Sequence, residues 1–175
     1  MCLPPIENVN AMTNAVTAKK KFAQLATNRF KFSLYLLSKL PAAFFSGVSV
    51  ISLHDNTCSV KVPYKWFSQN PFRSTYFACL AMAAELSTGM LAMLQVKGVE
   101  QPVSMLVLEM KAAFHKKATG NTVFTCLDGE LLAEMVNKAV TTQQPQTCIV
   151  TSVGLNDKGE EVAVFTITWT FKAKA

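Results

Sequence analysis

The chain has few of the residues from which metal centres and disulfide frameworks are built. It contains two histidines, and its five cysteines are widely separated, odd in number and without a C-x-x-C pair. Disulfide scaffolds need paired cysteines, and zinc sites need closely spaced Cys and His ligands. We therefore expect no disulfide framework, no metal site and no cofactor. A G-x-S-x-G turn is also missing, which argues against a Ser-His-Asp hydrolase.

Charged residues are scarce as well, at 16% of the 175 residues, whereas 50% are hydrophobic. The formal net charge of +6 is concentrated at one end, because residues 1–40 hold six basic residues and one acidic residue. The other 135 residues hold 11 basic and 10 acidic side chains. A nucleic-acid-binding domain usually carries its basic patch on the folded body. The nearly neutral body argues against nucleic acid, and the apolar composition favours an oligomer.

The N-terminus, MCLPPIENVN, has no basic region followed by an apolar run, so we expect no signal peptide and a cytoplasmic location. One stretch, residues 75–94, is long and apolar enough to cross a bilayer as a helix. It is rich in Ala, Ser, Thr and Gly, and it contains Glu85, which is costly in lipid. We therefore expect a buried helix covered by a sheet.

Residues 11–40 are predicted to form a helix, because apolar residues recur at spacings of three and four until Pro41 ends it. Such a basic amphipathic helix either packs its apolar stripe on the domain or lies on a membrane surface. We favour packing on the domain.

From residue 47 the apolar period changes to two, which predicts strands. Two strands flank a turn at 55–56, with Cys58, Val60 and Val62 facing inward on the second. Further strands are expected at 103–117, 122–127, 146–154 and 161–171, with hairpin turns at 119–121 and 156–159. A helix over 128–140 is expected to begin at Asp128 as its N-cap.

Two strands, a long buried helix and several antiparallel strands follow the order of the hotdog fold. The segment NPFRSTYFA at 70–78, with Glu85 nine residues after Tyr76, resembles the helix-entry motif of phenylacetate-degradation-type acyl-CoA thioesterases. Those enzymes have an Asn, a Gly-rich turn, His-Gly-Gly, and an Asp or Glu nine residues past the His. Residues 62–91 also resemble a bacterial family of unknown function in the same superfamily.

The resemblance implies an α+β fold, with an antiparallel sheet wrapped around a long central helix. We expect one hotdog domain at 42–175 and an N-terminal helical extension at 1–41. The long strand 103–117 has a strongly apolar face, and pairing its edge with a second copy would protect it. We therefore expect a homodimer, or a tetramer built from it.

The resemblance also assigns roles near the start of the central helix. Phe77 and Ala78 stand where the enzymes have two glycines, and a backbone N–H of one of them would polarise the thioester carbonyl. Glu85 would be the nucleophile or the general base. Ser87 and Thr88 would orient the attacking water from the partner subunit.

Four further residues flank this motif. Asn70 would brace the turn or bind the attacking water, and Tyr76 replaces the histidine while keeping a polar donor. Arg73, in place of a glycine, and Lys65 would bind coenzyme A phosphates. Two alternatives read Glu85 as a structural acid and Tyr76 as a core aromatic.

The function implied is hydrolysis of acyl-CoA or a related acyl thioester at a dimer-interface cleft. Because Tyr-Phe-Ala stands where the enzymes have His-Gly-Gly, the alternative is a non-catalytic module that binds acyl-CoA or an acyl chain.

Overall fold

A six-stranded antiparallel sheet forms the body of the protein, with its strands in the order β1-β2-β4-β5-β6-β3. The computed structural model describes residues 6–174, with side chains from residue 13 onward. The strands are β1 (Ser49–Leu53), β2 (Cys58–Val62), β3 (Val103–Phe114), β4 (Thr122–Cys126), β5 (Gln146–Asn156) and β6 (Glu161–Ala173). The helices are α1 (Ile6–Thr27), α2 (Arg29–Lys39), α3 (Pro41–Ser46), η1 (Trp66–Ser68, a 3₁₀ turn), α4 (Phe77–Val96) and α5 (Gly129–Thr142).

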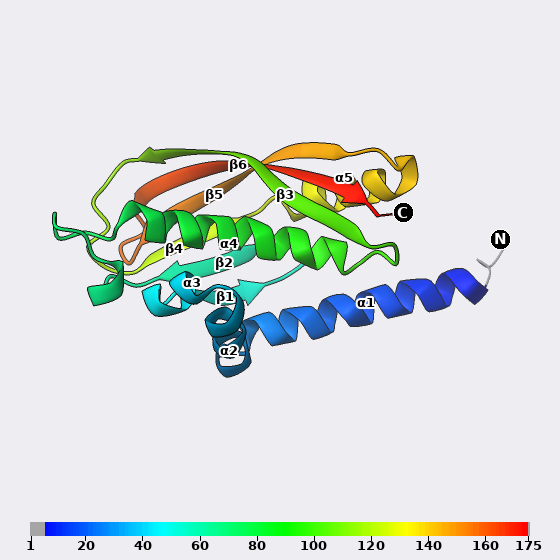
Figure 1. Ribbon diagram of the computed structural model, residues 1–175, viewed down its shortest axis with the longest axis horizontal. Coiled ribbons are helices and arrows are strands. Elements are labelled where there is room, and N and C mark those ends of the chain that lie inside the picture. Colours follow the sequence, from blue (N-terminus) through cyan, green and yellow to red (C-terminus); the bar gives the residue numbers. More distant parts are fainter. Residues whose placement is uncertain (1–5, 175) are drawn as a thin grey trace.

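The apolar helix α4 lies against one face of the sheet and forms the centre of the core (Figure 1). By length and composition it could cross a membrane, but 67% of its most apolar window is buried inside the protein. It packs on β1, β2, β4, β5 and β6. The helices α1 and α5 also contact it. The predicted hotdog fold, a sheet wrapped around a long central helix, is confirmed.

Alternating side chains on the strands supply the other half of this core. Cys58, Val60 and Val62 on β2 are fully buried, as predicted. The inward residues of β6 behave the same way, and burying a large side chain such as Phe165 contributes roughly 1.5–3 kcal/mol. Gly154 on β5 faces the Phe124 ring so closely that a Cβ there would lie 2.5 Å from the ring.

Two helices, α1 and α2, take the place of the single helix predicted over 11–40, and α3 follows them. Asn28 interrupts the predicted helix, because its side-chain oxygen accepts a hydrogen bond from the Lys31 amide at 3.0 Å and caps α2. A cap of this kind competes with a continuous helix. Pro41 ends α2, as predicted, and also begins α3.

The turn predicted at 119–121 does not form a hairpin. β3 and β4 are not paired; β3 lies at the far edge of the sheet and pairs with β6 alone. The apolar residues at even positions of β3, which alternation would place on one face, lie on both faces, because a bulge between Val107 and Glu109 shifts the register. Leu106 pairs with Thr170, whereas Met110 lies beside the buried Ile167.

Asp128 precedes α5, as predicted, but its side chain does not cap the helix. Its carboxylate instead accepts a hydrogen bond from the Thr151 amide at 2.7 Å. Asp128 is therefore the N-cap residue of α5, as predicted, but its carboxylate ties the start of the helix to β5 and does not cap it.

Candidate active site

The turn that leads into α4 is organised by Asn70. Its side-chain oxygen accepts hydrogen bonds from the amides of Phe72 (3.0 Å) and Ser74 (3.2 Å) and from the Ser74 hydroxyl (3.2 Å). Its amide nitrogen points to the Thr75 carbonyl at 3.5 Å. Of the two roles expected for Asn70, these contacts fit bracing the turn.

Arg73 occupies the turn with a φ of +58°, in the left-handed region. This backbone conformation costs about 1–2 kcal/mol for a residue with a Cβ atom and almost nothing for glycine. The conformation therefore agrees with the glycine found at this place in the resembled enzymes. The side chain of Arg73 is exposed to solvent.

The first turn of α4 leaves backbone donors free. Tyr76 is the N-cap residue, and its carbonyl accepts hydrogen bonds from the amides of Cys79 (2.9 Å) and Leu80 (3.3 Å). The amides of Phe77 and Ala78 have no acceptor among the described residues. Free amides at a helix N-terminus favour a negatively charged or polarised oxygen. The Tyr76 ring is exposed and touches the Phe77 ring edge-on, with centroids 4.8 Å apart.

Glu85 lies on the side of α4 that faces the junction of α2 and α3. It lines a cavity of about 220 Å³ together with Leu40, Pro41 and Met82. Partial burial raises the pKa of its carboxyl group above the usual value, because the charged form loses hydration. The carboxylate has no hydrogen bond or ion pair with any described residue, although Lys39 lines the same cavity.

Gly89 makes room for this carboxylate. A Cβ at residue 89 would lie 3.2 Å from Glu85 Oε1 and 3.3 Å from the Trp169 ring. The acid therefore sits one helical turn before a small residue, close to an aromatic side chain of β6. An environment of this kind raises the pKa of the acid by loss of hydration, which makes it a stronger proton acceptor.

Ser87 and Thr88 face the sheet and are fully buried. The Ser87 hydroxyl donates to the Ala84 carbonyl at 2.7 Å and lies 2.7 Å from the Ser152 hydroxyl on β5. Thr88 accepts a hydrogen bond from the Trp169 indole N–H at 3.0 Å. Neither side chain lines the cavity beside Glu85, so the two hydroxyls join α4 to the sheet within one subunit.

Lys65 and Arg73 lie in different surroundings. Lys65 lines a cavity of about 310 Å³ between α2 and β1, together with Arg29 and Lys61. Arg73 does not line that cavity and extends from the turn before α4.

The helix entry and Glu85 are too far apart to act together within one subunit. Residues 76 and 85 both lie along α4, where each residue adds about 1.5 Å, so they are separated by roughly 13 Å along the axis. A thioester carbonyl held at the helix entry is therefore out of reach of its own Glu85.

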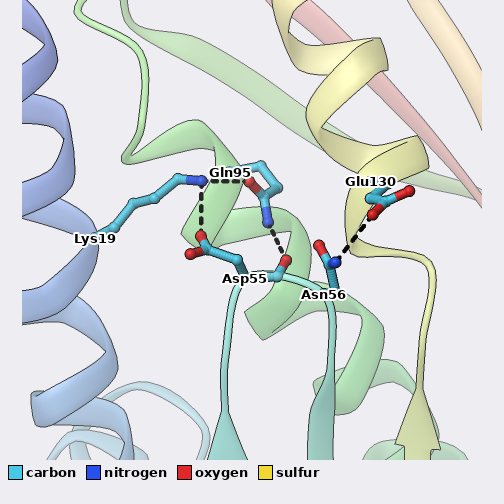
Figure 2. Close-up of polar contacts among 5 residues, drawn as sticks. All are labelled: Lys19, Asp55, Asn56, Gln95 and Glu130. Atoms are coloured by element: carbon cyan, nitrogen blue, oxygen red, sulfur yellow. Dashed lines mark hydrogen bonds and ion pairs between the residues drawn. The ribbon is translucent and has the colours of Figure 1, made fainter.

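Sequence reasoning missed a polar network at the opposite end of α4, drawn in Figure 2. The Lys19 ammonium donates to Asp55 at 3.0 Å and to Gln95 at 2.7 Å, and the Gln95 amide donates to the Asp55 carbonyl at 2.7 Å. Asn56 donates to Glu130 at 3.1 Å. The network borders a cavity of about 650 Å³. Its members come from four separate segments of the chain. The one sequence feature that indicates the network is Gln95, a polar residue in an apolar helix.

The model of a domain of unknown function, DUF4442, matches residues 28–171. The chain belongs to this family. The match spans α2 to β6 and so includes the helix entry and Glu85 of this DUF4442 protein. No curated protein matches the chain by sequence.

Solved structures share the fold at low sequence identity. A protein of unknown function from Chlorobaculum tepidum has a TM-score of 0.72 and 16% identity, over 94% of this chain and 100% of that one. A Haemophilus influenzae thioesterase has a TM-score of 0.59 and 10% identity, over 80% and 88%. The PaaI protein of the E. coli phenylacetic acid degradation operon has a TM-score of 0.55 and 11% identity, over 86% and 96%. The predicted resemblance to thioesterase-like hotdog proteins is confirmed at the level of the fold.

Proposed function

We propose that this DUF4442 protein is a thioesterase that hydrolyses acyl-CoA or a related acyl thioester in a cleft shared by two subunits. One observation carries the proposal: two free backbone amides begin α4, and a partly buried, unpaired carboxylate follows on the same helix. The pair supplies both parts that thioester hydrolysis needs, a site for the developing oxyanion and a base or nucleophile.

A two-fold dimer would bring these parts together. Side chains on the first half of α4 that stay at least partly exposed form one stripe: Phe77, Ala78, Ala81, Met82 and Glu85. In antiparallel helices, facing residue numbers have a constant sum, so an axis beside Ala81 sets Phe77 opposite the second subunit's Glu85. The small side chain of Ala81 allows the helices to approach closely.

The edge strand β3 supports the same dimer. Its side chains Met110 and Phe114 lie on the helix side of the sheet and remain exposed, at 38% and 51%. An exposed apolar edge strand is an aggregation hazard unless another chain covers it. Pairing two β3 strands about the axis would cover both edges and extend the sheet across the dimer.

In the proposed reaction, the amide of Phe77 or Ala78 donates a hydrogen bond to the thioester carbonyl oxygen. Such a donor contributes about 3–4 kcal/mol to the transition state. Glu85 of the other subunit either removes a proton from water as that water attacks, or attacks the carbonyl carbon itself and forms a mixed anhydride that water then hydrolyses. In both routes the carbon–sulfur bond breaks, the thiolate takes up a proton supplied by the consumed water, and the acyl group leaves as a carboxylic acid.

Supporting roles follow from position. Asn70 holds the turn, Tyr76 presents its hydroxyl beside the helix entry, and Arg73 and Lys65 supply positive charge for coenzyme A phosphates. Ser87 and Thr88 act through the core, by fixing α4 on the sheet, rather than by touching water. We place the reaction in the cytoplasm, where free thiols persist, such as the four buried ones among the described residues.

The second candidate function is a binding module for acyl-CoA or an acyl chain without catalysis. The exposed Phe77 ring favours it, because the glycines of the resembled enzymes let the substrate approach the backbone closely. A thiol-release assay with short, medium and long acyl-CoAs separates the two. Turnover that Glu85→Gln abolishes supports the thioesterase. Binding without turnover above background identifies the module.

A further inference from the structure

One end of the molecule carries many more basic than acidic side chains, with Glu85 beside it in a cavity that Lys39 also lines. Between Glu7 and Glu85 the sequence has a single acid, Asp55, and that acid is paired with Lys19. The same stretch contains nine basic residues: Lys19, Lys20, Lys21, Arg29, Lys31, Lys39, Lys61, Lys65 and Arg73. No carboxylate therefore lies on α2, α3, η1 or the turn before α4.

An aromatic cluster projects from this end. Phe45 of α3 stacks on Phe67 of η1, with centroids 5.4 Å apart, and Trp66 meets Phe67 edge-on at 4.8 Å. The three side chains are 47%, 56% and 74% exposed. Contiguous apolar surface of this kind on a water-soluble domain marks an interaction site. In Figure 1, α3 and the segment after β2 lie at the same end of the molecule as the start of α4.

Helix α2 adds a second exposed apolar feature. Phe32 and Leu36 are buried against the domain, as the preferred sequence interpretation requires. Phe30, Leu34 and Leu37 recur at i, i+4 and i+7 on the opposite side and are exposed. Packing on the domain thus uses only one of the two apolar faces of α2.

A cavity lined by basic residues lies between α2 and the first two strands. Arg29, Lys61 and Lys65 line it, and none of them forms an ion pair with a described residue. Its volume of about 310 Å³ exceeds that of a phosphate group. The cavity adjoins the aromatic cluster, because its lining residues Phe44 and Lys65 directly precede Phe45 and Trp66.

We propose that this end of the protein docks on membranes that contain anionic phospholipids. Trp66, Phe67 and Phe45 would enter the interfacial region, where Trp and Phe side chains of peripheral proteins partition. A lipid phosphate would enter the cationic cavity, because arginine and lysine bind phosphate through charge-assisted hydrogen bonds. The exposed Leu34 and Leu37 favour lipid over nucleic acid, since they offer neither charge nor a stacking surface. The proposal does not depend on thioester chemistry.

Vesicle binding tests the proposal. The full chain is mixed with vesicles of phosphatidylcholine alone and of phosphatidylcholine with phosphatidylglycerol, then followed by co-sedimentation and tryptophan fluorescence. Trp169 is buried, so a change on binding reports Trp66. We expect co-sedimentation with the anionic vesicles only, a shift of the emission to shorter wavelength, and weakening by salt. Trp66→Phe should remove the emission shift and keep the binding.

Matched variants locate the surface. Trp66→Ser with Phe67→Ser, and separately Lys61→Gln with Lys65→Gln, should each weaken vesicle binding by about tenfold or more. Leu127→Ser with Lys138→Gln changes an exposed apolar residue and an exposed basic residue elsewhere and should leave binding unchanged. Thermal melting of each variant checks that the fold is retained.

Four results would overturn the proposal: equal binding to neutral vesicles, binding of inorganic phosphate or glycerol phosphate without vesicle binding, preferential binding of single-stranded RNA, or loss of oligomerisation in the aromatic variants. The last would show that a second copy covers this surface.

Discussion

Replacing Glu85 by glutamine tests whether the acid is functional or structural. The two side chains have nearly the same shape, so the substitution removes the charge and the proton-accepting carboxylate and little else. If Glu85 is the catalytic acid, turnover should fall by about a hundredfold or more, as expected for the loss of a general base. The fold should be unaffected, because the carboxylate has no hydrogen-bond donor among the described residues that the amide would fail to satisfy.

The pH dependence of stability gives the substitution an independent signature. Burial raises the pKa of Glu85 in the folded state above its unfolded value. At acid pH the group is protonated in both states and contributes no difference. As the pH rises past the unfolded pKa, the unfolded state ionises more readily, and the folded protein loses stability until the pH exceeds the folded pKa. Glutamine does not titrate. The variant should therefore have the same stability as the wild type at acid pH, and the same or higher stability near neutral pH.

Thermal melting from acid to neutral pH, combined with the thiol-release assay, measures both effects. A structural carboxylate bonded to buried donors would give the opposite sign, since losing its hydrogen bonds costs roughly 1–3 kcal/mol. That cost lowers the melting temperature of a domain of this size by at least about 2–4 °C. A clearly lowered melting temperature with an unchanged hydrolysis rate would refute the assignment of Glu85.

Three further predictions concern the assembly and the core. Met110→Glu should convert the dimer into monomers by light scattering, whereas Ile149→Glu, on an exposed position of β5, should leave it dimeric; a dimeric Met110 variant would exclude β3 pairing. Gln95→Leu should lower the free energy of unfolding by about 1–3 kcal/mol in urea titrations, because the Asp55 carbonyl loses its donor and Lys19 loses one of its two acceptors. An unchanged value would show that the hydrogen bonds of Gln95 contribute nothing to stability. Burial raises the pKa of the Cys58 and Cys126 thiols to about 12, so thiol reagents at pH 8 should label them only after unfolding; rapid labelling of native protein would contradict their burial.

The hydrophobic pattern was sufficient to predict the sheet and its central helix. Alternating apolar residues, as around Val60 and Phe165, predict strands with one buried face. A helix that is apolar on every side, such as α4, must be buried, and a sheet that covers it satisfies both requirements. The pattern was insufficient where a local polar contact decided the outcome. Asn28 divides the N-terminal helix by capping it, and Asp128 bonds to Thr151, a partner 23 residues away.

Strand pairing was the second point at which sequence reasoning failed. A Thr-Gly-Asn turn after β3 is typical of a hairpin, but β3 pairs with β6, a strand that is distant from it in sequence. The bulge near Glu109 then moves Met110 to the helix side of the sheet, which alternation alone does not reveal. Pairing partners depend on the packing of the whole sheet.

For the candidate site, the sequence motif located the helix entry and the acid but not their surroundings. Ser87 and Thr88 lie within a turn of Glu85 in sequence, yet their hydroxyls face the sheet, because successive helical residues point in different directions. The boundary predicted at residue 41 between extension and domain stays a prediction. The family match begins earlier, at residue 28.

Mixed dimers test most directly whether the active site is shared between subunits. Ala78→Pro removes one of the two candidate amide donors, and proline is tolerated in the first turn of a helix; Phe77→Pro serves as the parallel variant. Glu85→Gln removes the acid. The Glu85→Gln homodimer should be inactive. A proline homodimer should be inactive if the proline replaces the residue whose amide donates to the thioester carbonyl. After equimolar mixing and subunit exchange, half of the dimers are heterodimers with one intact site in two, so activity should return to about a quarter of the wild-type rate. Subunit exchange verified by mass or label, without any return of activity for either proline variant, would contradict a site shared across the dimer.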